Sequence, residues 1–258
     1  MSLKNKARSG ILWSVVEQFS VKLISLVISL ILARILSPAE FGLIAMLSVF
    51  IAIGTSLMES GLTSSLIRTQ GADQRDYSTV FFFNLAGSAV VYVILFLTAP
   101  IIADFYRQPL LAAIVRLYGL SIVISAFFSV QNTLLTKEMK FKAQTMIQIP
   151  SVLIGGCLGI LLAYWGYGVW SIVWMNLLNI CISTILHWYM SPWRPIFIFD
   201  RKQFRHHFRF GYKMTLSGML DTLYKNIYTI IIGRYFAAAQ LGFYSRAESL
   251  SQLPVNII

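Results

Sequence analysis

The chain has 258 residues, of which 57% are apolar and only 12% are charged; this excludes a single soluble domain, because soluble domains average about 25% charged residues. The formal net charge of +11 at pH 7 is compatible with a nucleic-acid partner, but loops at the inner leaflet of membrane proteins are also rich in Lys and Arg, and the positions of the charges favour this second explanation. The composition therefore predicts a polytopic membrane protein, in which helices of roughly 20 apolar residues cross the bilayer.

Apolar windows along the chain predict seven transmembrane helices and the start of an eighth. The expected fold class is an all-α polytopic membrane protein. The connectors are mostly short, so consecutive helices are expected to run antiparallel. The predicted helices cover residues 11–36, 41–67, 78–103, 110–135, 146–165, 168–190 and 211–236, and the eighth begins near residue 241.

Most basic residues in the loops and near the helix ends gather on one side of the membrane. Only Arg34, Arg107 and Arg234 fall on the other side. Since cytoplasmic loops are enriched in Lys and Arg, we expect the basic side, and with it the N-terminus, to be cytoplasmic. The residues on that side are Lys4, Lys6, Arg8, Arg68, Arg75, Lys137, Lys140, Lys142, Arg194, Arg201, Lys202, Arg205, Arg209 and Lys213.

The longest connector, residues 191–210, reads "SPWRPIFIFDRKQFRHHFRF". Its aromatic residues alternate with basic ones, which is typical of an amphipathic segment that lies at a membrane surface. We expect it to lie on the anionic inner leaflet.

Two stretches 200 positions apart resemble each other. "LARILSPAEFG" (32–42) and "IIGRYFAAAQLGF" (231–243) each join two apolar segments, and Arg34 and Gly42 correspond to Arg234 and Gly242. The interval contains six helices, an even number, so both copies enter the membrane from the same side. This predicts a parallel repeat of two lobes.

The repeat divides the chain into three expected parts. Residues 1–190 form a six-helix transmembrane lobe, residues 191–210 form the amphipathic connector, and residues 211–258 begin a second lobe. The sequence ends part-way into its predicted eighth helix, so we expect the protein to be truncated.

Polar residues recur on one face of the first helix. Ser14, Gln18, Lys22, Ser25 and Ser29 are spaced by four, four, three and four positions, so they form one stripe. A charge at a helix centre costs about 2.5–3.5 kcal/mol on insertion scales. Serine alone is typical of polar contacts between helices, whereas Lys22 favours a polar cavity.

The repeat partner of this helix carries Asp221 and Lys225 one turn apart, close enough to pair. Lys225 corresponds to Ser25, and Thr229 to Ser29. Two facing stripes would create a polar cleft near the bilayer midplane, where substrate sites of transporters lie. The alternative is a self-neutralising pair that only allows the helix to insert.

Other polar residues are weaker candidates. Glu59 lies near the cytoplasmic end of the second helix and Arg116 about two turns into the fourth; they could pair, gate a pathway or reach the interface. We interpret Arg34 and Arg234 as anchors at the headgroups. We interpret four amide residues as packing contacts: Gln131, Asn132, Asn176 and Asn179.

Motifs for catalysis are missing from the sequence. It contains no GxxxxGK[ST] phosphate loop and no HExxH, CxxC or GxSxG. Cys157 and Cys181 both lie in apolar runs and predict neither a disulfide framework nor a metal site. We therefore expect no enzymatic activity and no resident cofactor.

The segment from Gly10 to Met46 resembles the opening of bacterial polysaccharide flippases, the Wzx-like branch of the multidrug/oligosaccharidyl-lipid/polysaccharide exporter superfamily. Leu32, Arg34, Leu36, Pro38 and Glu40–Gly42 are the most telling positions of this pattern, and Asp221–Ala247 is similar to the seventh helix and hinge of that family. The similarity covers essentially the whole chain and is that of the N-terminal part of a lipopolysaccharide biosynthesis protein.

The resemblance implies two six-helix lobes around a cation-rich cavity. Such proteins move undecaprenyl-diphosphate-linked oligosaccharide from the inner to the outer leaflet of the bacterial cytoplasmic membrane by alternating access, for polysaccharide and lipopolysaccharide export. The implied substrate-binding residues are Lys22, Arg116, Lys225, Gln18 and Ser25, and the residues expected to balance charge or couple an ion are Asp221, Glu17 and Glu59. A gradient of H⁺ or Na⁺ is a candidate driving force.

Expected partners are the lipid-linked oligosaccharide, membrane lipid and other polysaccharide-assembly proteins, but not nucleic acid. Two other functions stay open. A drug/cation antiporter of the same superfamily would need acidic cavity residues, and a membrane-embedded glycan transferase or polymerase would typically carry a large extracytoplasmic loop.

Overall fold

The computed structural model describes residues 3–59 and 61–255. Within these ranges the chain is all-helical and has no strand. Its helices are α1 (Leu3–Ile35), α2 (Pro38–Glu59), α3 (Leu62–Arg68), α4 (Gln74–Tyr106), α5 (Leu110–Tyr118), α6 (Leu120–Lys137), α7 (Phe141–Tyr164), α8 (Val169–Met190), α9 (Arg201–Tyr235) and α10 (Ala238–Val255).

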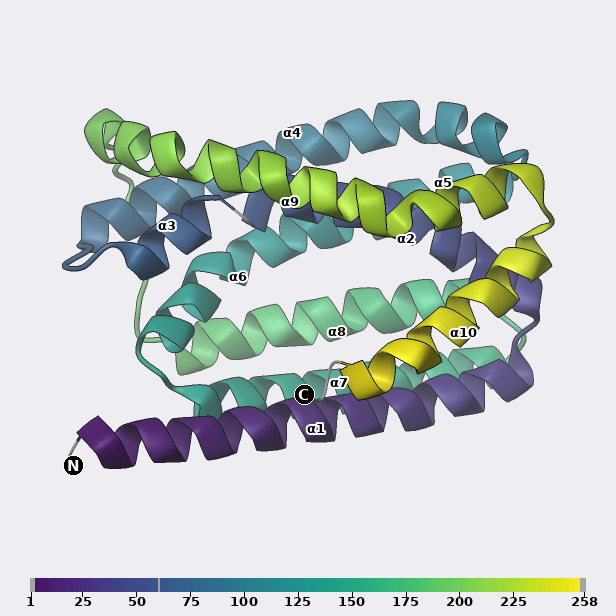
Figure 1. The fold of residues 1–258 in the computed structure, drawn as a ribbon, viewed down its shortest axis with the longest axis horizontal. Helices are drawn as coiled ribbons and strands as arrows, with labels where there is room; N and C mark the ends of the chain where they lie inside the picture. Colours follow the sequence, from purple (N-terminus) through teal and green to yellow (C-terminus); the bar gives the residue numbers. More distant parts are fainter. Residues whose placement is uncertain (1–2, 60, 256–258) are drawn as a thin grey trace.

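The long helices lie side by side along the long axis of the molecule and alternate in direction (Figure 1). The antiparallel arrangement expected from the short connectors is confirmed. The turns that join α1 to α2 and α9 to α10 lie at the same end of the bundle, which we call the hinge end. The start of α1, α3 and the start of α9 lie at the opposite end.

The length and apolarity of its helices identify the chain as a multi-pass membrane protein. Six segments of the described chain are long and apolar enough to cross a membrane: Gln18–Ile35, Pro38–Leu57, Gln74–Tyr106, Leu110–Lys137, Phe141–Tyr164 and Val169–Met190. The predicted helix 211–236 lies within α9, which does not meet this criterion, because Lys213, Asp221, Lys225 and Arg234 interrupt its apolar run.

Three predicted boundaries differ from the structure. The predicted helix 41–67 is divided into α2 and α3, and the predicted helix 110–135 is interrupted at Gly119, between α5 and α6. The amphipathic connector is also not a separate element: residues 191–200 are non-helical, and residues 201–210 are the first turns of α9. Helix α9 is thus continuous, although its composition changes from aromatic and basic residues at its start to more apolar residues later.

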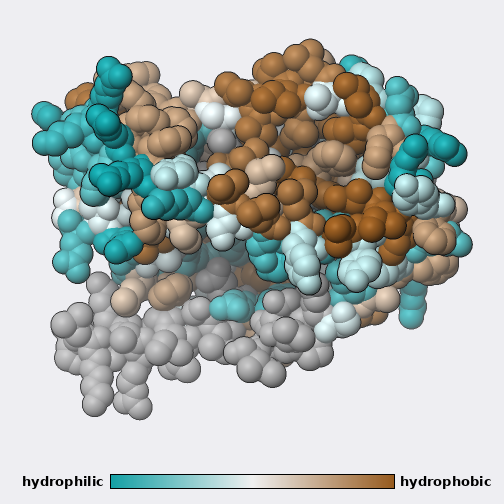
Figure 2. Space-filling view, turned by 45° about the horizontal axis from the view of Figure 1, so that its top comes forward, coloured by the Kyte–Doolittle hydropathy of each residue, from teal (hydrophilic) through white to brown (hydrophobic). Residues whose placement is uncertain are grey.

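Many large apolar side chains are exposed, as expected for surfaces that contact lipid. On α1 the exposed residues Phe19, Leu23, Val27 and Leu30 form a ridge with helical spacing. The space-filling view of the α4–α9 face shows hydrophobic residues across the middle, hydrophilic ones gathered at the end where α3 and the start of α9 lie, and further hydrophilic ones at the opposite edge (Figure 2). This distribution matches a bilayer-spanning band with a polar cap.

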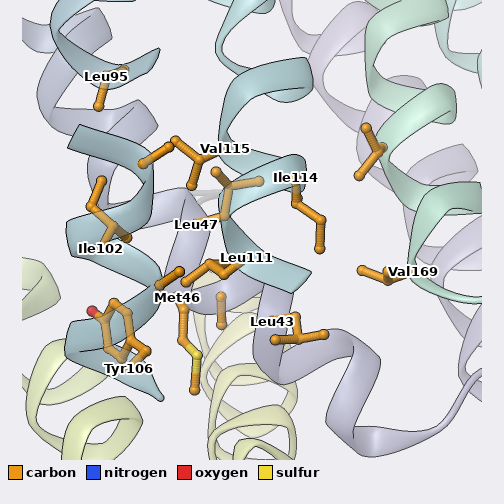
Figure 3. Close-up of a cluster of buried hydrophobic side chains, with 14 of the residues drawn as sticks. Leu43, Met46, Leu47, Leu95, Ile102, Tyr106, Leu111, Ile114, Val115 and Val169 are labelled. Carbon is orange, nitrogen blue, oxygen red and sulfur yellow. The ribbon is translucent and has the colours of Figure 1, made fainter. Parts of the chain in front are cut away.

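The largest buried cluster joins α2, α4, α5, α8 and α10 toward the hinge end. Met46 and Leu47 of α2 pack against Ile102 and Tyr106 of α4 and Leu111 of α5 (Figure 3). Burial of such side chains contributes about 1.5–3 kcal/mol each relative to exposure in water. In a membrane the gain comes mainly from close packing, because lipid tails are as apolar as the core.

The two hinges have equivalent hydrogen bonds. The Ser37 backbone N–H and hydroxyl both donate to Glu40 Oε2, at 2.7 and 2.9 Å. In the second copy the Ala237 N–H donates to Gln240 Oε1 at 3.2 Å. In each copy the side chain three residues on satisfies an unpaired N–H at the helix start, as in half of a capping box. The hinges are thus structural equivalents.

The two hinges also pack against each other through glycine. A β-carbon on Gly42 would lie 1.8 Å from the carbonyl oxygen of Ala238, and one on Gly242 would lie 1.8 Å from the carbonyl oxygen of Pro38. Pro38 and Ala238 are themselves repeat equivalents. Each glycine therefore lets the start of the other copy's helix approach, as a pseudo-two-fold axis between α2 and α10 requires. The contact joins equivalent residues of the two predicted copies, and the division of the chain into two lobes stays a prediction.

At the opposite end, a buried polar cluster attaches α9 to the first lobe. His207 of α9 is fully buried; its Nε2 lies 3.0 Å from Asp76 Oδ1 and its Nδ1 lies 2.8 Å from Ser65 Oγ. Burial lowers the pKa of His207, and this effect outweighs the hydrogen bond and charge of Asp76, which raise it. The imidazole is therefore neutral at pH 7. The neutral imidazole donates its Nε2–H to the Asp76 carboxylate, and its Nδ1 accepts a hydrogen bond from the Ser65 hydroxyl.

Replacing Asp76 by Ala is expected to destabilise the protein by about 3 kcal/mol. The change removes a buried charge-assisted hydrogen bond to His207 and the capping box that Asp76 forms with Asp73. The check is the thermal unfolding midpoint in detergent, with Asp104→Ala as control because Asp104 is exposed. The control is expected to change stability by no more than about 0.5 kcal/mol. Equal midpoints for both variants would contradict this role of Asp76.

Candidate functional site

A cavity of about 1000 Å³ lies between α1, α2, α7 and α8 on one side and α9 and α10 on the other. Its lining is mixed. The apolar part includes Ile28, Leu32, Phe41 and Ile44. The polar part consists of Ser25, Ser29, Ser48, Asn176, Asn179, Lys225, Asn226, Thr229, Ser245, Arg246, Glu248 and Ser249.

The repeat shapes this cavity. Four pairs of its lining residues are 200 positions apart in the sequence, two pairs from α1 and α9 and two from α2 and α10. Equivalent helices of the two copies therefore face one space from opposite sides. The pairs are Ser25 and Lys225, Ser29 and Thr229, Ala45 and Ser245, and Ser48 and Glu248.

Arg246 is the cation with the most contacts across the cavity. Its guanidinium carbon lies 3.5 Å from the ring centroid of Phe41 on α2, and Nη1 donates to the Ser29 hydroxyl on α1. Its Nε is buried and has no hydrogen-bond partner among the described residues. A cation–π contact stabilises a guanidinium, but a buried N–H without an acceptor is unfavourable. The Nε–H of Arg246 is thus a buried donor without an acceptor from the described part of the chain in this conformation.

The second cavity cation, Lys225, is paired within its own helix. Its Nζ lies 2.7 Å from Asp221 Oδ2, and both side chains are more than half exposed. The predicted pairing of these two residues is confirmed. An exposed pair of this kind contributes at most about 1 kcal/mol, so the ammonium can exchange its partner at little cost.

The amide groups of α8 add neutral donors and acceptors. Asn176 and Asn179 both line the cavity, and the Asn176 amide donates to the Ile172 carbonyl oxygen at 2.8 Å. Their interpretation as packing contacts therefore needs correction, since they face a cavity and not a helix contact alone. Asn132 does make such a contact: its side-chain oxygen accepts from Gln144 at 3.0 Å.

The structure brings together only some of the predicted site residues. Ser25 and Lys225 line the cavity, whereas Lys22 and Gln18 lie about one and two turns before Ser25 on α1 and are not part of the lining. Arg116 is also outside: it is exposed on α5, where it stacks on Phe96 at 4.7 Å. The amphipathic spacing of α5 directs this residue to the surface, so we no longer assign it to the cavity.

The remaining predicted acids are placed as follows. Asp221 reaches the cavity only through its pair with Lys225. The side chains of Glu17 and Glu59 lie outside those that the structure describes. Neither a cluster of three metal-ligating side chains nor a disulfide occurs in the described part of the chain, in which Cys157 and Cys181 are free.

Sequence reasoning missed the contribution of α10. Ser245, Arg246, Glu248 and Ser249 fall at positions i, i+1, i+3 and i+4, which places them on one helix face. Applying the 200-residue repeat to the second helix of each copy, and not only to the first, would have pointed to this face.

Comparison with known families decides the membership of the chain. A sequence profile of the family described as "Polysaccharide biosynthesis protein" matches residues 31–258. The chain belongs to this family. The resemblance to polysaccharide flippases inferred from the hinge motif and the first helix is thereby confirmed.

Curated proteins of polysaccharide biosynthesis are similar to nearly the whole chain. The lipopolysaccharide biosynthesis protein WzxC of Escherichia coli is 28% identical over 98% of the chain and 52% of its own length. The teichuronic acid biosynthesis protein TuaB of Bacillus subtilis is 28% identical over 98% of the chain and 53% of its own length. The succinoglycan biosynthesis transport protein ExoT of Rhizobium meliloti is 27% identical over 95% of the chain and 50% of its own length.

The chain therefore spans about half the length of the curated relatives it matches. No solved structure matches it.

Proposed function

We propose that this chain contributes the first lobe, and the first two helices of the second, to a transporter of lipid-linked oligosaccharide. In this proposal the transporter moves an undecaprenyl-diphosphate-linked oligosaccharide from the inner to the outer leaflet of the bacterial cytoplasmic membrane by alternating access. The N-terminus is cytoplasmic, so the hinge end faces outward. Membership in the polysaccharide biosynthesis family supports the substrate class.

The cavity is the observation that carries the proposal. It combines two cations, one acid and many neutral hydroxyl and amide groups within about 1000 Å³. Cations bind diphosphate through charge-assisted hydrogen bonds that are strong where water is scarce. Hydroxyl and amide groups match the donors and acceptors of sugars. The apolar tail of the carrier lipid can remain in the bilayer while the headgroup crosses.

The contact between the hinges supports a conformation closed toward the outside. Gly42 and Gly242 hold α2 and α10 together at the hinge end, and Phe41, Ile44 and Ala45 of α2 line the cavity beside this crossing. In this conformation the substrate reaches the cavity from the cytoplasmic side. Lys22 and Gln18 extend the polar stripe of α1 toward that side, so we propose that they contact the substrate on entry.

The two alternatives are less well supported by the lining. A drug/cation antiporter would need carboxylates to bind its cation, and Glu248 is the single carboxylate among the described lining residues. A transferase or polymerase would need a catalytic constellation, and the sequence carries no signature of one. We propose that the protein is not an enzyme and that an ion gradient, of H⁺ or Na⁺, drives transport.

Deletion of the gene in its source cell tests the proposal. The measurement is the chemical form and leaflet of the lipid-linked sugar that accumulates. We expect complete repeat units trapped on the cytoplasmic leaflet. Incomplete units, or complete units on the outer leaflet that remain unpolymerised, would mean that the protein is an enzyme of assembly. Unchanged sugar with increased drug sensitivity would instead favour the antiporter.

A further inference from the structure

The first turns of α9 present a basic face and, opposite it, a buried face. At 3.6 residues per turn, Arg201, Lys202, Arg205, Arg209 and Lys213 fall within an arc of about 120°, and all five are exposed. The opposite face is buried against the first lobe through His207 and Gly211, which contact Asp76 and Gly61. The basic arc therefore points away from the protein.

Aromatic side chains border this basic arc. Phe204 packs on Phe83 of α4 with ring centroids 4.8 Å apart, and Phe208 stacks on Tyr212 at 6.0 Å. Phe197, in the preceding non-helical stretch, is 96% exposed, and its ring stacks on Phe82 with centroids 5.3 Å apart. Aromatic rings beside basic side chains are typical of the boundary between headgroups and acyl chains.

Hydrogen bonds fix the depth of this segment. The Ile196 N–H donates to the Ser78 hydroxyl at 3.1 Å, and the Asp200 N–H donates to the Thr79 hydroxyl at 3.0 Å. Both acceptors lie in the first turns of α4, where the membrane-spanning helix begins. The basic arc is thus held at one end of the apolar band, at the level of lipid headgroups.

The five cations have no carboxylate partner in the part of the chain that the structure describes. The nearest acid along the chain, Asp200, accepts the backbone N–H groups of Lys202 and Gln203 as a helix cap. A surface with five unpaired cations and a hydrophobic border is complementary to an anionic amphiphile.

We propose that the basic arc of α9 and the adjoining aromatic residues bind anionic phospholipid of the surrounding bilayer. The phosphate-bearing headgroups lie on Arg201, Arg205 and Arg209, and the acyl chains lie along Phe197 and Phe208. Because the same helix carries Lys225 into the cavity, lipid binding holds the first helix of the second lobe at a fixed depth. This site does not depend on the identity of the transported substrate.

The test is native mass spectrometry of the intact protein in micelles with equal amounts of phosphatidylglycerol and phosphatidylethanolamine. The wild type is expected to retain phosphatidylglycerol preferentially. Since each Lys or Arg near an anionic surface contributes about fivefold in affinity, the triple variant Arg201→Gln, Arg205→Gln, Arg209→Gln is expected to lower this retention by roughly 100-fold. Its thermal unfolding midpoint should stay unchanged, because all three side chains are exposed.

A matched control removes three exposed cations at or before the starts of α4 and α7: Arg75→Gln, Lys140→Gln, Lys142→Gln. This variant is expected to keep the preference for phosphatidylglycerol. Equal losses in the two triple variants would show that net charge alone is responsible and would overturn the site. Retention of both lipids to the same extent by the wild type would also overturn it. A separate variant, Phe197→Ala, should weaken retention of both lipids, since it removes apolar contact and no charge.

Discussion

Replacement of Gly242 by Leu is expected to separate α10 from α2 and to open the hinge end of the cavity. Any side chain at this position begins with a β-carbon 1.8 Å from the carbonyl oxygen of Pro38. Backbone atoms cannot rotate away as a flexible side chain can, so the two helices must move apart. Overpacking of this kind costs roughly 1–3 kcal/mol and occasionally more. We expect the upper part of this range.

Opening can be measured by the reactivity of a cysteine placed in the cavity. Ser48 lines the cavity on α2 beyond the glycine contact, so Ser48→Cys in a background without Cys157 and Cys181 reports on access. A membrane-impermeant maleimide added outside the cell should label it poorly in the wild type and strongly with Gly242→Leu. Gly42→Leu should act in the same way, because its β-carbon meets Ala238 in the equivalent geometry.

Ala237→Leu is the control for this experiment. It adds the same side chain at an exposed hinge position of the second copy. It is expected to leave both labelling and the unfolding midpoint unchanged. Weak labelling in Gly242→Leu, together with a normal midpoint, would show that the two hinges do not close this end of the cavity.

The architecture was largely predictable because its signals are local. Apolar run length defines membrane helices, and six such segments are found. The hinge motif repeats its arginine and its glycine, and in the structure the two glycines make equivalent contacts. Ser25, Ser29, Lys225 and Thr229 line one cavity because equivalent positions of a parallel repeat face a common axis. The spacing of polar residues and the 200-residue repeat were sufficient to predict that these four residues face a common space.

Other features depend on contacts between distant residues. Asp76 and His207 lie 131 positions apart, and neither flanking sequence indicates a buried pair. Arg116 and Arg246 both lie on predicted helices, yet one stacks on Phe96 at the surface and the other contacts α1 and α2 in the cavity. The rotation of a helix about its axis decides between these outcomes. For α5 and α10, packing against neighbouring helices sets that rotation.

Arg246→Gln is expected to reduce the export of lipid-linked sugar by about 10- to 100-fold. Hydrogen bonds to charged groups contribute about 1.5–3 kcal/mol, and each 1.4 kcal/mol corresponds to tenfold. Arg246→Lys should restore only part of the activity. An ammonium keeps the charge, but it lacks the planar group that reaches both the Phe41 ring and the Ser29 hydroxyl. The measurement is the rate at which lipid-linked sugar reaches the outer leaflet in cells that express each variant.

A stability measurement separates binding from folding at this position. Since Nε of Arg246 is buried without a partner, Arg246→Met should keep or raise the unfolding midpoint, because an incompletely paired charge is replaced by an apolar chain of similar length. Arg116→Gln is the matched control and should leave export unchanged. A lowered midpoint for Arg246→Met would show that the arginine is retained for its contacts with α1 and α2. Loss of export with a normal midpoint would instead place Arg246 in contact with the transported headgroup.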